Sequence, residues 1–307
     1  MDAALHTKKV RISSARKAFV IINYALMLAM AFVFFAPYIN ILAKSLNSAA
    51  DTELGGISFF PRVWSWNNFH VTLSDPSMWQ GFKITALRVV IGSLFSLLVT
   101  YMAAYGLLRK NMRFRRIIVA FLTLPMFIGG GIVATYIVYA KIKVYDSFLV
   151  YILPTAFSFY NMVIIRTYLL TVPESLRESA RIDGAGELRI MFQIMLPLSM
   201  PVVATILLWN AVGHWNDWTT TLYYINSASL YTMQFNLQQS LKEAARIQEM
   251  IAEALASGRL LGDSSGSVSK DSILSAQIIV STLPIILVYP FLQRYFISGV
   301  MIGGVKE

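Results

Sequence analysis

The sequence predicts an all-α integral membrane protein with six transmembrane helices. Of its 307 residues, 56% are hydrophobic and only 14% are charged, whereas a soluble domain averages about 25% charged residues. Apolar runs of about 20 residues, enough to cross ~30 Å of hydrocarbon, alternate with polar segments along the chain. The net charge of +10 comes from basic residues beside these runs. Because such flanking charges set membrane orientation, no nucleic-acid partner is expected.

The first apolar run follows a basic segment at residues 1–17. Its uncharged stretch, residues 18–43, is about twice as long as a signal-peptide core and has no convincing small-residue cleavage site, so it predicts a first span. The transmembrane domain is expected to cover residues 18–298, followed by a tail at 299–307. The five further spans are expected at residues 82–108, 117–140, 148–170, 198–224 and 273–296.

Basic residues gather on alternate sides of the predicted spans. Residues 1–17 and 109–116 each contain five Lys or Arg, and four more Arg lie between residues 166 and 189. The positive-inside rule places these segments and both termini in the cytoplasm. The outer segments are longer and sparser in basic residues. The last of them, residues 226–272, is expected to hold an amphipathic helix at 243–256 and a flexible Gly/Ser linker at 262–267.

The charged segment at residues 172–197 predicts two short helices joined by a glycine turn. Thr171 and Glu174 have capping-box spacing, which predicts that the first helix begins there. A second amphipathic helix is expected to run from residue 188 to 195. Two glycines can adopt positive φ and end the first helix, namely Gly184 and Gly186.

This segment resembles the EAA loop of ATP-binding-cassette import permeases. In that motif Glu, a small residue and Ala are followed by Asp-Gly-Ala and, nine positions later, by Ile-x-Leu-Pro. Ser179 stands where the family often has Ala, a change between small residues. The alternative is a solvated amphipathic loop with an ordinary glycine stop. The resemblance implies that a partner ATPase is coupled through Glu178, Ala180, Asp183, Gly184, Ala185, Leu196 and Pro197.

The fifth predicted span carries a group of polar and aromatic side chains. Polar groups within a membrane are costly and usually face a protein interior or a water-filled path. Trp209, Gly213 and Asn216 share one helical face, with Asp217 beside it. Aromatic rings stack on sugars and amides bond hydroxyls, so the group predicts a carbohydrate path. The expected path residues are Trp209, Asn210, Gly213, His214, Asn216 and Asp217, with Tyr136, Tyr160 and Asn161 as weaker candidates.

Several of these features also have structural explanations that involve no binding of a solute. Trp215 and Trp218 also fit an interfacial belt, and His214 also fits a hydrogen-bonded helix contact. The aromatic pattern at residues 59–69 resembles the first outer loop of sugar-import permeases, and it equally fits a headgroup-level belt. Three glycines at 129–131 in the third span predict either close helix packing or a flexible point.

The resemblance extends over nearly the whole chain, to the carbohydrate-uptake, maltose-type permeases. The closing pattern at residues 293–306 resembles the subgroup that imports polysaccharide fragments, aldouronates and alginate oligosaccharides. The resemblance implies a type I importer permease fold in the bacterial cytoplasmic membrane. It also implies as partners a second related permease subunit, two cytoplasmic ATPase subunits, an extracytoplasmic solute-binding protein, an oligosaccharide and membrane lipid.

No cofactor, metal site or enzyme activity is expected in this chain. It has no cysteine, which excludes a disulfide framework and thiolate chemistry. Neither a Gly-x4-Gly-Lys-Ser/Thr loop nor a His-Glu-x-x-His motif is present, so ATP and Mg are expected only on the partner ATPases. Two rivals stay open: an ABC permease for another solute, such as a polyamine or phosphate, and a stand-alone channel or membrane enzyme.

Overall fold

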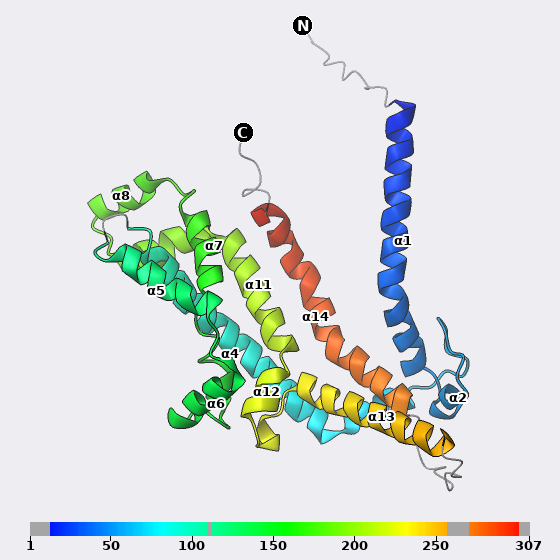
Figure 1. Ribbon diagram of the computed structural model, residues 1–307. Coiled ribbons are helices and arrows are strands. Elements are labelled where there is room, and N and C mark those ends of the chain that lie inside the picture. Colours follow the sequence, from blue (N-terminus) through cyan, green and yellow to red (C-terminus); the bar gives the residue numbers. More distant parts are fainter. Residues whose placement is uncertain (1–12, 110–111, 257–269, 301–307) are drawn as a thin grey trace. The chain divides into compact units, whose positions relative to one another are not determined.

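The computed structural model describes residues 13–109, 112–256 and 270–300. Every regular element within these residues is a helix, and their only β-type contact is an isolated bridge between Asn47 and Trp64 (Figure 1). The chain divides into two compact units, residues 1–70 with 265–279 and residues 71–264 with 280–307. Most of the predicted N-terminal segment, the Gly/Ser linker and most of the tail lie outside the described residues.

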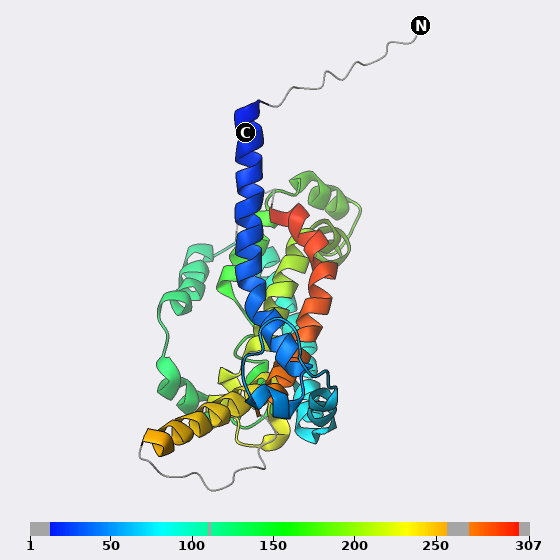
Figure 2. The same cartoon turned by 90° about the vertical axis from the view of Figure 1, so that its right-hand side faces the viewer.

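The first unit contains α1 (Ser14–Ser45), a helix of 32 residues that Figures 1 and 2 show as one continuous rod. Its N-terminus is capped by Ser13, whose hydroxyl accepts from the backbone N–H of Arg16 at 3.3 Å. Large apolar side chains are exposed along most of its length. This length and exposure agree with the first predicted span.

After α1, residues 46–66 fold around the buried side-chain amide of Asn47. Its Oδ1 accepts the backbone N–H groups of Arg62 and Val63, both at 2.8 Å. Its Nδ2 donates to Asp51 Oδ2 at 2.9 Å and to Thr52 Oγ1 at 3.0 Å, both on α2 (Ala49–Glu53). One side chain thus satisfies backbone groups that a sheet would otherwise pair. We call residues 46–66 the Asn47 module.

The second unit is built along α4 (Pro76–Gly106), which follows the short helix α3 (Asn67–Ser74). Asp75 caps α4, because its carboxylate accepts the N–H of Ser77 at 2.8 Å. The helices that pack on α4 are mainly α7 (Phe159–Leu169), α11 (Met200–Asn216) and α13 (Met233–Ala256). The outer helix predicted at 243–256 therefore begins ten residues earlier, at Met233. The N–H of Met233 donates to Thr85 Oγ1 of α4 at 3.0 Å.

The third predicted span is two helices rather than one. Its segments α5 (Arg115–Phe127) and α6 (Gly131–Lys141) meet at 118°. Gly131 adopts a φ of +73°, and a Cβ on any of the three glycines would meet at most one atom, at 3.5 Å. The glycines therefore break the helix, and they pack closely against none of the residues that the structure describes.

The fourth predicted span, residues 148–170, is not one continuous helix. The segment consists of η1 (Phe148–Tyr151), non-helical residues and α7. Pro154 lies in the gap, where it lacks the N–H that a helix needs and disfavours helical backbone at the residue before it. Seven residues of apolar chain are thereby taken out of the helix.

Length and composition identify three helices able to cross a membrane within the described residues, and up to five if each bent pair counts as one span. The three are α1, α4 and the stretch Lys270–Pro290 of α14 (Lys270–Val300). The bent pairs are α5 with α6, and Glu187–Leu198 with α11. The number of six spans stays a prediction.

Candidate functional site

The first helix of the loop at residues 172–197 is α8 (Glu174–Ile182). The predicted capping box does not form: Pro173 is the cap residue, and the Thr171 hydroxyl donates instead to the carbonyl of Tyr168 at 2.7 Å. Glu174 is held by Arg177 one turn later, at 3.1 Å. A carboxylate in the first turn still complements the helix dipole, so the helix begins where the sequence predicts, for a different reason.

The end of α8 follows the sequence prediction closely. The Gly184 N–H donates to the Arg181 carbonyl at 3.0 Å, and the Ala185 N–H donates to the Ala180 carbonyl at 2.9 Å. This pair of bonds is a Schellman motif, which requires a left-handed residue after the helix. Gly184 supplies it with a φ of +81°, whereas Gly186 has an ordinary φ of −69°. Ala180, Gly184 and Ala185 thus have roles in one turn.

The side of α8 that faces away from the buried Ala180 is exposed. Glu178 and Asp183 are exposed, and Ile182 between them is 86% exposed. A single exposed apolar side chain is ordinary on a protein surface, so the exposure of Ile182 alone does not identify a binding surface.

The second loop helix is less regular than predicted. It starts as α9 (Glu187–Arg189), continues with π-helical bonding as η2 (Ile190–Met195) and ends as α10 (Leu196–Leu198). Ile190, Met191 and Met195 are buried in the core formed with α4 and α7. Leu196 packs against this core, whereas Pro197 is exposed. At Ser199 the chain bends by 86° into α11, so α11 follows the loop directly along the chain.

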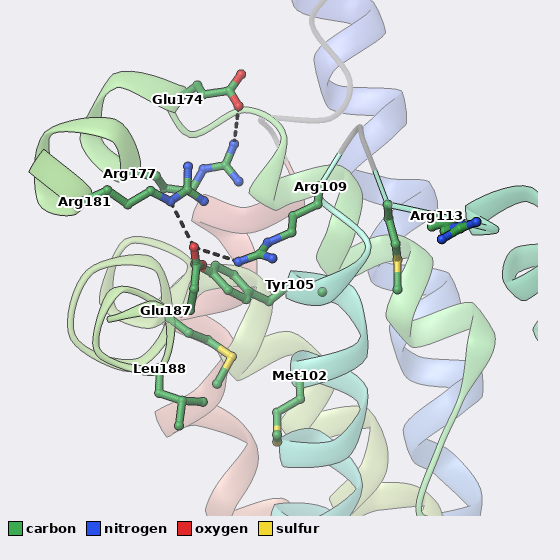
Figure 3. Close-up of a pocket in the computed structure, with 12 residues that line it drawn as sticks. Met102, Tyr105, Arg109, Arg113, Glu174, Arg177, Arg181, Glu187 and Leu188 are labelled. Atoms are coloured by element: carbon green, nitrogen blue, oxygen red, sulfur yellow. Dashed lines mark hydrogen bonds and ion pairs between the residues drawn. The ribbon is translucent and has the colours of Figure 1, made fainter. Parts of the chain in front are cut away.

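Glu187, which sequence reasoning did not single out, joins this loop to α4. Its carboxylate accepts from Tyr105 Oη at 2.8 Å and from Arg181 Nε at 3.0 Å, and it pairs with Arg109 Nη2 at 2.8 Å (Figure 3). These groups border a recess of about 940 Å³ that is also lined by Met102, Arg113, Arg177 and Leu188. Donors from α4, from the segment that follows α4 and from α8 converge on one carboxylate, which anchors the loop.

Glu187→Gln is expected to loosen this anchor. The amide keeps the shape of the side chain but loses the charge that holds two guanidinium groups. Backbone amides at residues 174–190 should then exchange hydrogen severalfold faster. Hydrogen exchange measured by mass spectrometry checks this, with Asp183→Asn as a control because Asp183 is exposed on the same loop. Equal exchange in both variants would contradict an anchoring role for Glu187.

Four of the predicted path residues lie together where α7 meets α11. The rings of Tyr160 and Trp209 stack with centroids 6.5 Å apart and an interplanar angle of 20°. Asn161 Nδ2 donates to Asn210 Oδ1 at 3.1 Å, and Asn210 Nδ2 donates to Ser96 Oγ of α4 at 3.4 Å. Tyr160 is 55% exposed and Trp209 is 41% exposed. The result is an exposed aromatic pair beside two hydrogen-bonded amides, of which Asn161 is buried and Asn210 is half-buried. We call this group the aromatic–amide seam.

The other predicted path residues lie elsewhere. His214 is buried so tightly that a Cβ on Gly92 would come within 2.6 Å of its ring, which fits a helix contact. The rings of Tyr136 and Tyr145 pack together with centroids 4.9 Å apart, and the carboxylate of Asp217 forms an ion pair with Arg88. Trp215 is buried, which does not fit a belt residue. Gly213 and Asn216 remain exposed along α11.

Comparison with known proteins agrees with this architecture. The chain is 30% identical over 290 residues to the polygalacturonan/rhamnogalacturonan transport system permease protein YtcP of Bacillus subtilis (strain 168), covering 94% of this chain and 99% of YtcP. It is also 30% identical over 306 residues to protein LplC of the same organism, covering 99% of each. The crystal structure of a bacterial ABC transporter involved in the import of the acidic polysaccharide alginate matches 93% of this chain and 99% of the aligned one, with a TM-score of 0.82 and 25% identity.

The match to a family model covers most of the chain. Residues 92–302 fit the model described as the binding-protein-dependent transport system inner membrane component. This range includes the broken third span, the loop with Gly184 and Glu187, the aromatic–amide seam and α14. The chain therefore belongs to the family of binding-protein-dependent transport system inner membrane components.

Proposed function

We propose that this chain is one permease subunit of an ATP-driven importer that carries oligosaccharides across the bacterial cytoplasmic membrane. The observation that carries the proposal is the aromatic–amide seam within the membrane domain. Tyr160 and Trp209 offer ring faces for the C–H side of a sugar, and the half-buried amide of Asn210, held in place by the buried Asn161, lies beside them for its hydroxyls. The names of YtcP and of the alginate importer point to the same class of solute.

The seam favours a sugar over the rival solutes. A polyamine needs carboxylates and a phosphate needs cations, whereas Tyr160, Asn161, Trp209 and Asn210 are all uncharged. The one carboxylate that sequence reasoning assigned to the path, Asp217, is already paired with Arg88. A stand-alone channel or membrane enzyme would have no use for the exposed surface of α8.

The loop at residues 172–197 is proposed to couple this chain to its ATPases. Glu178, Ile182 and Asp183 would enter a cleft of one of two cytoplasmic ATPase subunits, while Glu187 holds the loop to α4. ATP-driven movement of the loop would pass through the bend at Ser199 to α11, which carries Trp209. A second permease subunit, lipid and an extracytoplasmic solute-binding protein complete the proposed assembly, with six spans and both termini in the cytoplasm.

Labelling tests the orientation, because the chain has no native cysteine. A single cysteine at Glu178 is expected to react with a membrane-impermeant maleimide only after the membrane is permeabilised, which lets the label reach the cytoplasmic face. A cysteine at Leu54, 81% exposed in the Asn47 module, should react in sealed cells. In the assembled transporter the cysteine at Glu178 should also crosslink to the ATPase. Reaction of the Glu178 cysteine in sealed cells would refute the proposed coupling role.

A further inference from the structure

An arginine is buried within α4 at a place that neither the loop nor the seam explains. Arg88 is 1% exposed. Its Nη1 donates to the backbone carbonyl of Asp217 at 2.8 Å, its Nη2 pairs with the Asp217 carboxylate, and its guanidinium lies 4.5 Å from the ring centre of Tyr151. A charge in a membrane helix is costly, so it is a candidate for a functional role, to be considered together with its partner.

Asp217 forms the corner between two helices. Its backbone follows the last residue of α11 with an extended ψ of 111°. Its Oδ1 accepts the N–H of Thr219 at 2.9 Å and that of Thr220 at 3.1 Å, which caps the start of α12 (Thr219–Tyr224). The Thr219 and Thr220 hydroxyls donate to the same carboxylate at 2.7 and 2.5 Å. Asp217 thus ends one helix and begins the next.

Arg88 ties this corner to α4. A cation at the carbonyl end of α11 complements the dipole of that helix. One turn further along α4, Gly92 lets the ring of His214 approach so closely that no Cβ would fit between them. The outer end of α11 is therefore joined to α4 by a charge-assisted contact and by close packing, both next to Asp217.

Both ends of α11 contact α4, but the contacts differ in strength. At the inner end, beside the 86° bend, Ser199 Oγ lies 3.0 Å from Tyr101 Oη of α4, a hydrogen bond between two neutral hydroxyls. The outer end is held by the ion pair of Arg88 and Asp217, and charge-assisted hydrogen bonds are roughly twice as strong as neutral ones. Trp209 and Asn210 lie between these ends. A helix that is held more firmly at one end than at the other tilts when the weaker end is pushed, and residues along its middle are displaced sideways.

We propose that Arg88 and Asp217 are a positioning pair that fixes the outer end of α11 to α4, so that movement of the loop tilts α11 and shifts the aromatic–amide seam. The inference rests on the proposed transport function. Neither residue of the pair contacts the sugar. Loss of the pair should therefore lower the maximal rate of uptake and the coupling of uptake to ATP hydrolysis, and leave the KM for the sugar nearly unchanged.

The test uses the assembled transporter in liposomes with four variants: Arg88→Met, Asp217→Asn, the double variant and Lys83→Met. Each single variant leaves one charge of the pair without its partner, which destabilises the fold. The double variant leaves no unpaired charge, and such replacements are often neutral for stability. It is expected to assemble normally and still to lose about tenfold or more in maximal uptake, with KM within about twofold of wild type. Lys83 is exposed on the same helix, and its variant should behave as wild type.

Two kinetic results would overturn the proposal. Normal uptake by the double variant would show that the pair stabilises the fold and has no role in transport. A raised KM with an unchanged maximal rate in Asp217→Asn would make Asp217 a sugar contact instead.

A second measurement does not depend on the solute. Spin labels at exposed Leu98 on α4 and Leu222 on α12 should give a broader distance distribution in the double variant than in wild type. An unchanged distribution would refute the positioning role even if the transported solute proved not to be a sugar. Absence of oligosaccharide uptake by the wild type, with a broadened distribution in the variant, would refute the proposed function alone.

Discussion

Gly184→Val is expected to abolish most ATP-driven uptake while leaving the chain inserted in the membrane. At a φ of +81°, an L-residue pays about 1–2 kcal/mol for left-handed backbone, and a β-branched side chain fits that region worst. No atom lies within 4 Å of an added Cβ, so the cost is conformational rather than steric. The turn relieves it most easily by giving up the two Schellman hydrogen bonds, which changes the direction in which Ile182 and Glu178 point.

Gly186→Val is the matched control for this substitution. Gly186 lies two residues further on, has an ordinary φ of −69°, and would also place its Cβ in open space. Sugar uptake per ATP hydrolysed should fall steeply in the Gly184 variant and remain near wild type in the Gly186 variant, at equal amounts of protein in the membrane. Similar losses in both variants would show that bulk in the loop, rather than the left-handed turn, determines coupling.

Trp209→Ala should raise the KM for the transported oligosaccharide by about tenfold, because it removes the larger ring face of the seam; the stacking of a nucleic-acid base on an aromatic side chain, which sets the scale, contributes roughly 1–3 kcal/mol, and tenfold corresponds to 1.4 kcal/mol. Trp209→Phe keeps a ring against Tyr160 and should retain most of the affinity. Uptake rates over a range of sugar concentrations in liposomes measure the effect. ATPase assembly should be unaffected, since Trp209 lies in α11, outside the loop.

The control for this change is a tryptophan outside the seam. Trp79 is 56% exposed near the start of α4, where its indole N–H donates to the Leu73 carbonyl at 2.7 Å. Trp79→Ala removes the same side chain without touching Tyr160 or Asn210. An unchanged KM in Trp209→Ala, or an equal rise in both variants, would remove the seam from the sugar path.

Local features were predictable from the sequence. Gly184 follows from the motif because a Schellman turn involves only neighbours along the chain, and the first span follows from uniform apolar composition. The sequence could predict that Asn161 and Asn210 both line one path. It could not predict that they contact each other, because this contact depends on how α7 and α11 pack.

Features that depend on distant partners were not predictable. Glu187 looks like any loop glutamate, because Tyr105 and Arg109 lie about 80 residues earlier in the chain. Helical spacing predicts that Asp217 lies on the same face as Trp209. The helix ends at Asn216, however, so that spacing no longer fixes where Asp217 points. The break in residues 148–170 was hidden because a single proline is tolerated in many membrane helices.

The Asn47 module has a chemical weak point. Hydrolysis of the Asn47 side-chain amide to a carboxylic acid would remove the Nδ2 donor that lies 2.9 Å from the Asp51 carboxylate, and ionisation would set two negative charges against each other. The hydrogen bond from Asn47 is the chief cause that holds the pKa of Asp51 below its ordinary value, so deamidation would also remove the main group that stabilises the Asp51 carboxylate. Deamidation at this one position is therefore expected to destabilise the whole module. Complete burial keeps water away from Asn47, and the backbone N–H of Ser48, whose nitrogen would otherwise attack the amide, is bonded to the Val63 carbonyl at 2.8 Å.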